Sequence, residues 1–228
     1  MSALTFTLKT NITHAIDCRR LTTNNLADLT INEIENLKLL NTQNSPIISD
    51  YFDISGTDAN HIVFKNTIQQ MHYIGHKMTH GQITIEGNCG DFLGSQMRGG
   101  SIICQGSAKD RVGDQMRRGL ILIDGNAGDY CGSRMIAGTI GVFGNVGSYA
   151  GFAMKRGTIL LTQTPKLHAT IQDCGTHTLP FLALLFSSFK ELSTRFNRIK
   201  SLRATRYAGD LACNGNGEIL ICNTDVSA

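Results

Sequence analysis

Clustered cationic side chains are the residues of this chain whose type and spacing best fit a binding chemistry. Methionines recur every 19 residues, and five basic residues occupy the two positions after members of that series: Arg98, Arg117, Arg118, Lys155 and Arg156. If equivalent positions stack in space, these like charges crowd together, which is unfavourable unless they splay into water or an anion lies among them. Two interpretations stay open: a solvated or subunit-facing rim, and a basic track for a polyanionic ligand or an acidic partner surface.

Acidic and histidine residues offer two further candidate sites. One set of carboxylates also recurs every 19 residues, as a calcium ladder would require: Asp91, Asp110 and Asp129. Each follows a turn position, so we favour capping of turns by these carboxylates. Three histidines step by four residues, as ligands on one helix face would: His72, His76 and His80. Their segment lies inside the first repeat unit, so we expect turn or solvent positions.

No catalytic constellation is visible in the sequence. It contains no G-x-S-x-G, no Walker loop and no set of four metal ligands at zinc-site spacing. Its seven cysteines include no C-x-x-C pair, which is untypical of a disulfide framework or a zinc site. Cys89, Cys104 and Cys131 fall in columns of small or apolar residues and are predicted to lie in the core. We expect no catalytic residue, no metal ligand and no cofactor in this chain.

The element that would position the basic residues is a 19-residue repeat. Methionines stand at 78, 97, 116, 135 and 154, and glycines at 81, 100, 119, 138 and 157. Two apolar columns lie two residues apart, which is the spacing of one face of a strand: Ile83, Ile102, Ile121 and Ile140, then Ile85, Cys104, Ile123 and Val142. A unit of this size cannot bury its apolar face alone, so the units must stack. The pattern predicts an all-β dominated fold, a right-handed parallel β-helix of 19-residue coils with short helical or irregular flanks.

The flanks divide the chain into three predicted segments. Residues 1–60 precede the coils and contain a capping box, Thr30 with Glu33, that starts a short helix. Residues 61–162 form the repeat. Residues 163–228 begin where the glycine rhythm stops, and contain an apolar helix from Leu179 to Phe189. Because its apolar residues lie almost all round, we expect that helix to be buried on the stack or under a partner subunit. Turns over Tyr207–Asp210 and a last strand complete the chain.

Composition and charge exclude several classes of protein. The chain has 228 residues, a net charge of +3, and 41% hydrophobic against 17% charged residues, which excludes a disordered chain. The charge excess is too small to indicate nucleic-acid binding. The N-terminus shows no apolar signal segment, and no apolar run approaches the ~18 residues that a membrane helix needs. We expect a cytoplasmic protein with neither a nucleic-acid nor a membrane partner.

The repeat and the two ends together resemble the C-type subunit of formylmethanofuran dehydrogenase and of the related bacterial formyltransferase/hydrolase complex. The repeat motifs that carry the resemblance are Gly87, Gly90 and Gly94, with the turns Met97-x-x-Gly100 and Met116-x-x-Gly119. The motifs at the ends are Thr30–Ile34, Pro180–Leu185, Arg206–Asp210 and Gly217–Leu220. The repeat motif is also found in the C-terminal domain of glutamate synthase (the GXGXG type), so the motifs at the ends favour the C-type subunit. The chain departs from the family pattern at Lys109, Arg111 and Ile136.

The resemblance implies a structural subunit without an active site of its own, in a heteromeric complex of one-carbon metabolism. Such complexes interconvert a formyl group on a methanofuran-like carrier with formate or carbon dioxide, as in methanogenesis-type or methylotrophic formaldehyde oxidation. Metal centres and catalysis are expected in sister subunits. Because the polyglutamylated tail of the carrier is anionic, Arg98, Arg117, Arg118, Lys155 and Arg156 form a hypothetical binding track for it.

Two alternatives of different class stay open. One is a glutamate synthase-type subunit that works beside a flavin and iron–sulfur enzyme in glutamate or N-methylglutamate synthesis. The other, less favoured, is an autonomous enzyme. Co-purifying partners would separate the first alternative from a formyl-transfer complex, and assay of the isolated chain would test the second.

Overall fold

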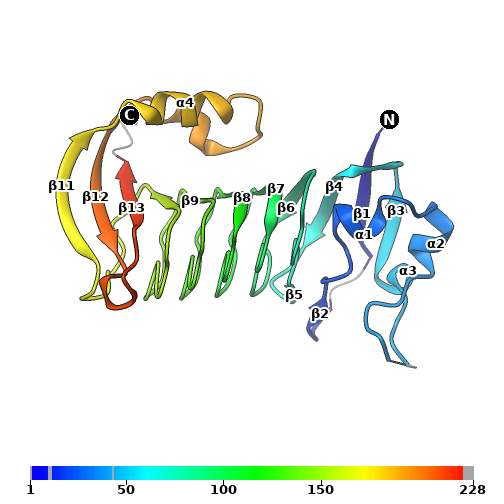
Figure 1. Cartoon of the computed structure of the whole chain (residues 1–228). Helices are drawn as coiled ribbons and strands as arrows, with labels where there is room; N and C mark the ends of the chain where they lie inside the picture. The colour runs from blue at the N-terminus through cyan, green and yellow to red at the C-terminus, as the bar shows by residue number, and fades with distance from the viewer. Residues whose placement is uncertain (1, 10–11, 43, 223–228) are drawn as a thin grey trace.

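The structure, a computed structural model, describes residues 2–9, 12–42 and 44–222, and most of its regular elements are strands. Seven strands run parallel through the middle of one sheet: β4 (Asp58–Thr67), β6 (Gln82–Gly87), β7 (Arg98–Cys104), β8 (Arg118–Ile123), β9 (Thr139–Val142), β10 (Thr158–Leu161) and β13 (Gly217–Cys222). Figure 1 shows them side by side, in the order in which the units follow one another along the chain. The prediction of an all-β dominated chain is confirmed.

Strands from both flanks extend this sheet. At the N-terminal end, β1 (Ala3–Leu8) lies parallel to β4, and β3 (Phe52–Ser55) lies antiparallel to β1. At the C-terminal end, β12 (Arg203–Gly209) lies antiparallel to β13, and β11 (Gln172–Thr178) antiparallel to β12. The sheet therefore has 11 strands in the order β11-β12-β13-β10-β9-β8-β7-β6-β4-β1-β3. A separate parallel pair joins β2 (Ile16–Asp17) to β5 (Met71–His72).

The strand register reproduces the 19-residue repeat. Ile83 of β6 pairs with Ile102 of β7, and Ile121 of β8 pairs with Ile140 of β9. The whole isoleucine column is fully buried, as are the five methionines at 78, 97, 116, 135 and 154. The sequence-predicted strand columns and the inward position of the methionines are therefore confirmed.

The prediction of a right-handed parallel β-helix is wrong. The described residues form one open 11-stranded sheet and one two-stranded pair, and the large sheet is not closed into a barrel. Only four to seven residues of each central unit form a strand. The rest of each unit, which leads from the end of one strand to the start of the next, is called the return path here. It consists of turns and isolated bridges, such as that between Cys89 and Ala108. It includes left-handed residues such as Phe92 (φ 64°) and Gly94 (φ 62°), whose backbone cannot continue a strand.

Glycine is required where the return path crosses the core. Gly113 has a φ of 63°, and a Cβ atom at this position would clash with Cδ1 of Ile140 in β9. Its 19-residue relatives Gly75, Gly94 and Gly132 meet an isoleucine Cδ1 in the same way. This glycine column therefore serves backbone conformation and packing in the interior, and not ligand binding.

The sheet has an apolar layer on each of its two faces. Inside, side chains such as Ile102 and Met97 pack between the strands and the return path. Outside, Ile103, Leu122 and Leu160 point away from that core and are covered by the C-terminal segment, including Phe186 and Phe196. These three outward-pointing strand residues are apolar because a second layer of side chains covers them.

Short helices lie in the flanks of the described chain: α1 (Thr23–Leu26), α2 (Ile31–Glu35), α3 (Ile48–Tyr51) and α4 (Phe181–Ser188). The predicted capping box is confirmed at α2, where the Glu33 N–H donates to Thr30 Oγ1 (3.3 Å) and the Thr30 N–H donates to Glu33 Oε2 (2.8 Å). The predicted turns over Tyr207–Asp210 are wrong as far as Gly209, because β12 extends to that residue to pair with β13. Among the described residues, no helix is long and apolar enough to span a membrane.

Candidate functional site

The five predicted track residues lie at the starts of strands or in the turns before them. Arg98 begins β7 and Arg118 begins β8, and their Cα atoms are register partners. The N–H of Arg117 donates to Met97 O and that of Lys155 to Met135 O, both at 2.8 Å. The backbone ladder therefore holds the basic residues of consecutive units at the strand spacing of ~4.8 Å.

One uncharged position divides the track into two groups. The position between Arg117 and Lys155 in the ladder is Ile136, whose N–H donates to Met116 O at 2.7 Å. Arg98, Arg117 and Arg118 thus form one group, and Lys155 and Arg156 form another about two strand spacings (~10 Å) away. The structure brings the predicted residues to one side of the stack but does not make them continuous.

All five track residues are exposed, and their charges are uncompensated by carboxylates in the described part of the chain. Exposed cations of this kind attract an anion through a screened field. The arrangement provides neither a nucleophile nor a general base. What the arrangement offers an anion is positive charge and hydrogen-bond donors.

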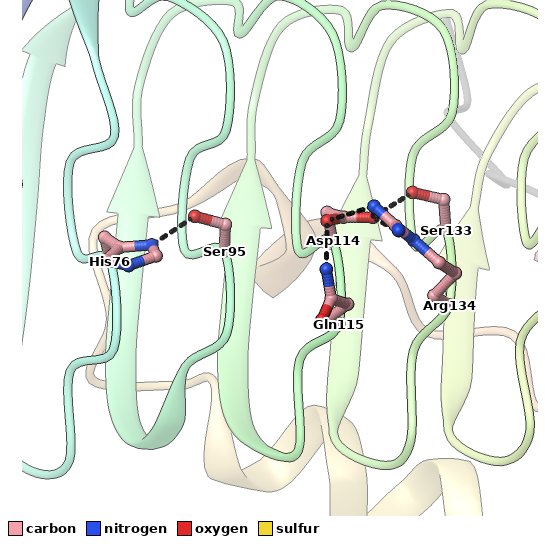
Figure 2. A network of polar contacts seen from close by, with 6 residues as sticks. All are labelled: His76, Ser95, Asp114, Gln115, Ser133 and Arg134. Atoms are coloured by element: carbon pink, nitrogen blue, oxygen red, sulfur yellow. Dashed lines mark hydrogen bonds and ion pairs between the residues drawn. The ribbon is translucent and has the colours of Figure 1, made fainter.

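Arg134, which precedes the methionine column, has a different role. Its Nη2 lies 2.9 Å from Oδ2 and 3.0 Å from Oδ1 of Asp114, a carboxylate that is almost completely buried (Figure 2). Ser133 Oγ donates to the same carboxylate at 2.6 Å, and Gln115 Nε2 donates to it at 3.1 Å. Arg134 therefore joins two successive units and does not contribute a free cation.

The aspartate column forms a ladder of backbone caps. Asp91 Oδ1 accepts the N–H of Asp110 (3.1 Å), Asp110 Oδ1 accepts that of Asp129 (2.9 Å), and Asp129 Oδ1 accepts that of Ser148 (2.7 Å). Each carboxylate thus holds the turn of the next unit, which is the capping role favoured from the sequence. Within the described ranges, no group of three or more His, Cys, Asp or Glu side chains is placed to hold a metal ion.

Of the three regularly spaced histidines, His76 lies in a turn and His80 is exposed, as expected, whereas His72 lies in strand β5 and is only partly exposed. His76 is half-buried and its Nδ1 lies 2.7 Å from Ser95 Oγ of the next unit (Figure 2). Burial lowers the pKa of His76, and the positive charges of Lys77 and Arg19 lower it further, against an opposing effect of Asp17. His76 is therefore held in its neutral form as part of the stacking.

The three cysteines predicted to lie in the core do so. Cys89, Cys104 and Cys131 are at most 1% exposed. Burial raises the pKa of Cys131 to about 12, so the reactive thiolate is strongly disfavoured there. Cys89 Sγ lies 3.9 Å from Cys104 Sγ, and this contact, together with burial, raises the pKa of Cys89. These thiols behave as small apolar side chains.

Sequence reasoning missed a ladder of rings that crosses the turns of successive units. Its members share a left-handed backbone, with φ between 60° and 64°: Tyr73, Phe92, Arg111, Tyr130 and Tyr149. The rings of Tyr73 and Phe92 stack at 4.6 Å and those of Tyr130 and Tyr149 at 5.0 Å. Arg111 lies between the two pairs, with Cζ 4.9 Å from the centre of the Tyr130 ring and 5.8 Å from that of Phe92.

The signal for this ladder was present in the sequence as a further 19-residue column. Arg111 takes the place of a ring in this column without breaking the stack. Its guanidinium is planar and stacks on aromatic faces. The ladder ends at Tyr149, which is 41% exposed, and the other four members are partly buried. The ring of Phe152, which is 38% exposed, packs edge-on against Tyr149 at 6.3 Å.

The chain is similar along its whole length to a chain of known structure. That chain belongs to the formyltransferase/hydrolase complex (FhcABCD) from Methylorubrum extorquens, determined in complex with methylofuran. The two share 25% sequence identity with a TM-score of 0.62, and the similarity covers 96% of this chain and 99% of the other. No family model and no curated protein matches the chain. Sheet, flanks and C-terminal segment therefore correspond as a whole to one chain of a heteromeric complex.

Proposed function

We propose that this chain is a non-catalytic structural subunit, of the C type, in a formyltransferase/hydrolase or formylmethanofuran dehydrogenase-like complex of one-carbon metabolism. The observation that carries the proposal is the end-to-end similarity to one chain of the Methylorubrum complex, 96% of this chain against 99% of that one. The motifs at both chain ends, which favoured the C-type subunit from the sequence, support the same assignment. The chain organises catalytic sister subunits around a rigid sheet.

Purification of the tagged chain from its native host tests this proposal. We expect subunits related to formyltransferase and metal-dependent hydrolase chains to co-purify in fixed stoichiometry, as measured by native mass spectrometry. A flavin and iron–sulfur partner, visible by its yellow-brown absorption, would instead support a glutamate synthase-type subunit. Recovery of the chain alone, at concentrations where related complexes persist, would contradict membership of a complex.

The exposed track extends the proposal to a ligand. The solved relative is a complex with methylofuran, and the uncompensated charges of Arg98, Arg117, Arg118, Lys155 and Arg156 suit the polyglutamate tail of a methanofuran-like carrier. The two-group arrangement fits an extended anionic chain better than a single compact anion. The tail would lie along the stack, while the reacting end of the carrier reaches the sister subunits.

Binding of a synthetic hexaglutamate peptide to the purified chain tests the track. Neutralising Arg98, Arg117 and Arg156 together by substitution to Gln should weaken binding about tenfold at low salt, about 0.5 kcal/mol for each charge. The difference should shrink as salt is added, because exposed charges are screened. Substitution of three exposed lysines away from the track, Lys65, Lys109 and Lys166, to Gln is the matched control. Equal affinity of both triple variants would exclude the track.

A further inference from the structure

The C-terminal helix α4 leaves one apolar side uncovered. Leu182 and Phe186 face the sheet and are buried in the outer core with Phe196 and Leu122. Leu184, on the opposite side, is 78% exposed, the largest value among the exposed large hydrophobic residues of the described chain. Figure 1 shows α4 outside the sheet, towards the C-terminal end of the stack. The sequence predicted burial on the stack or under a partner, and the structure shows that the stack covers one side of the helix and leaves Leu184 exposed.

A groove lies between α4 and the chain that follows it, and Leu184 contributes to its lining. We call it the α4 groove, and it has a volume of about 590 Å³. Its walls are formed by α4 and the chain that follows: Ala183, Leu184, Phe186, Ser187, Lys190, Asn197, Ile199, Lys200 and Leu202. The floor is therefore apolar, and two lysines stand at its rim.

The rim carries one sign of charge. Lys190 and Lys200 line the groove, and both are exposed. No carboxylate lines the groove, and Glu191 is the one acidic residue between positions 179 and 203. In the described chain, neither lysine forms an ion pair. An apolar floor with an uncompensated basic rim is complementary to an apolar anchor flanked by carboxylates.

The groove is preformed. Thr194 Oγ1 donates to Asp124 Oδ1 at 2.6 Å, and the Arg195 N–H donates to the same atom at 2.8 Å. Asn197 Nδ2 donates to Leu192 O at 2.7 Å and closes the loop on itself. These bonds fix the segment after α4 to the end of β8. The segment therefore loses little conformational entropy when a partner binds in the groove.

We propose that the α4 groove is the docking site for an acidic segment of a sister subunit, which inserts an apolar side chain beside Leu184 and places carboxylates on Lys190 and Lys200. The inference rests on the proposed membership of a complex and names the surface that makes the contact. A second copy of this chain is a poor occupant, because two identical basic rims would repel each other.

Photo-crosslinking within the native complex tests this assignment. A benzophenone amino acid replaces Leu184 in the tagged chain, which is expressed in the native host; the same replacement at Leu40, another exposed leucine in the N-terminal flank, is the matched control. We expect Leu184 to crosslink to a sister-subunit peptide that contains apolar and acidic residues. A crosslink to another copy of this chain or to the same polypeptide, or no crosslink in an assembled complex, would overturn the inference.

Charge reversal gives an independent measurement. Lys190→Glu with Lys200→Glu should weaken retention of the crosslinked subunit about tenfold, as expected for loss of two charge pairs in a partly desolvated groove. Lys65→Glu with Lys109→Glu is the control of equal charge, and circular dichroism of each variant verifies folding. If wild-type chain recovers no sister subunit, the proposed function and the inference both fail. If the complex assembles equally with both double variants, the docking site alone is excluded.

Discussion

The guanidinium of Arg134 lies against the buried carboxylate of Asp114, with Nη2 2.9 Å from Oδ2 and Nε 3.2 Å from Oδ1. The two residues belong to successive units of the repeat, so this ion pair ties one unit to the next. It also separates the basic residues of the chain into two kinds. Arg134 is paired within the stack, while Arg98 and its track neighbours form no ion pair among the described residues.

The Asp114–Arg134 pair should contribute measurably to stability. Removing Arg134 leaves a buried carboxylate without its cation, although Ser133 and Gln115 still donate to it. We expect Arg134→Ala to lower the free energy of unfolding by about 1–2 kcal/mol, because the bonds lost are charge-assisted but half-exposed at the arginine. Urea denaturation measures this. Arg98→Ala, an exposed track residue, should change stability by less than about 0.5 kcal/mol, and an equal effect of both would refute the structural role of Arg134.

His76 should make the protein less stable in weak acid. Because the folded pKa of His76 is lowered, mainly by burial, the unfolded chain takes up a proton that the folded chain resists. Stability is therefore complete above the unfolded pKa of ~6.5 and decreases as the pH falls below it. His76→Asn, which can still bond to Ser95, should show a smaller drop in Tm between pH 7.5 and 5.5 than the wild type. His80→Asn, an exposed neighbour, is the control, and a pH dependence of Tm unchanged by His76→Asn would contradict the assignment.

Arg111 should stabilise the ladder of rings by stacking between Phe92 and Tyr130. Arg111→Ala removes its contacts with Phe92 and Tyr130 and should cost about 1 kcal/mol, whereas Arg111→Phe should retain the stack and most of the stability. Alanine and phenylalanine must both adopt the left-handed backbone of this position (φ 61°). The difference in stability between the two variants therefore reports the stacking and not the backbone strain. Thermal unfolding of the two variants is the measurement. Equal stability of the Ala and Phe variants would show that the ladder contributes nothing.

The thiols should divide into two classes by reactivity. Cys18, Cys89, Cys104, Cys131 and Cys222 are buried, while Cys174 and Cys213 are partly exposed. Burial raises the pKa of both Cys131 and Cys222 to about 12, so neither forms a thiolate near neutral pH. A thiol reagent at pH 8 should modify two cysteines quickly in the folded protein and all seven in denaturant. Rapid modification of Cys131 in the folded state would show that the interior opens.

The repeat could be predicted from the sequence because the residues of each column occupy the same kind of position in every unit. The isoleucines are spaced for one face of a strand, and the methionines fill the corner beside them, so both columns follow from local rules. The type of fold could not be predicted in the same way. Period-two spacing shows that a strand exists in each unit, but it does not show that left-handed residues such as Phe92 keep the return path from becoming further sheets.

The candidate site was predictable only in part. The basic residues could be placed on one side of the stack because they share the register of the methionines, but the commitment of Arg134 to Asp114 depends on a contact between units. The covered outer face depends on contacts distant in sequence, such as that of Phe196 with Phe143. β12 was missed because its pairing with β13 and β11, and not its own residues, defines it as a strand.

If the chain organises a formyl-transfer complex and performs no chemistry itself, as we propose, deletion of its gene in the native host should abolish both formyl transfer to a furan carrier and assembly of the complex in the extract. Both should return when the purified chain is added back, and the isolated chain should show no turnover. Turnover by the isolated chain, or full activity and assembly in its absence, would show that this assignment is wrong.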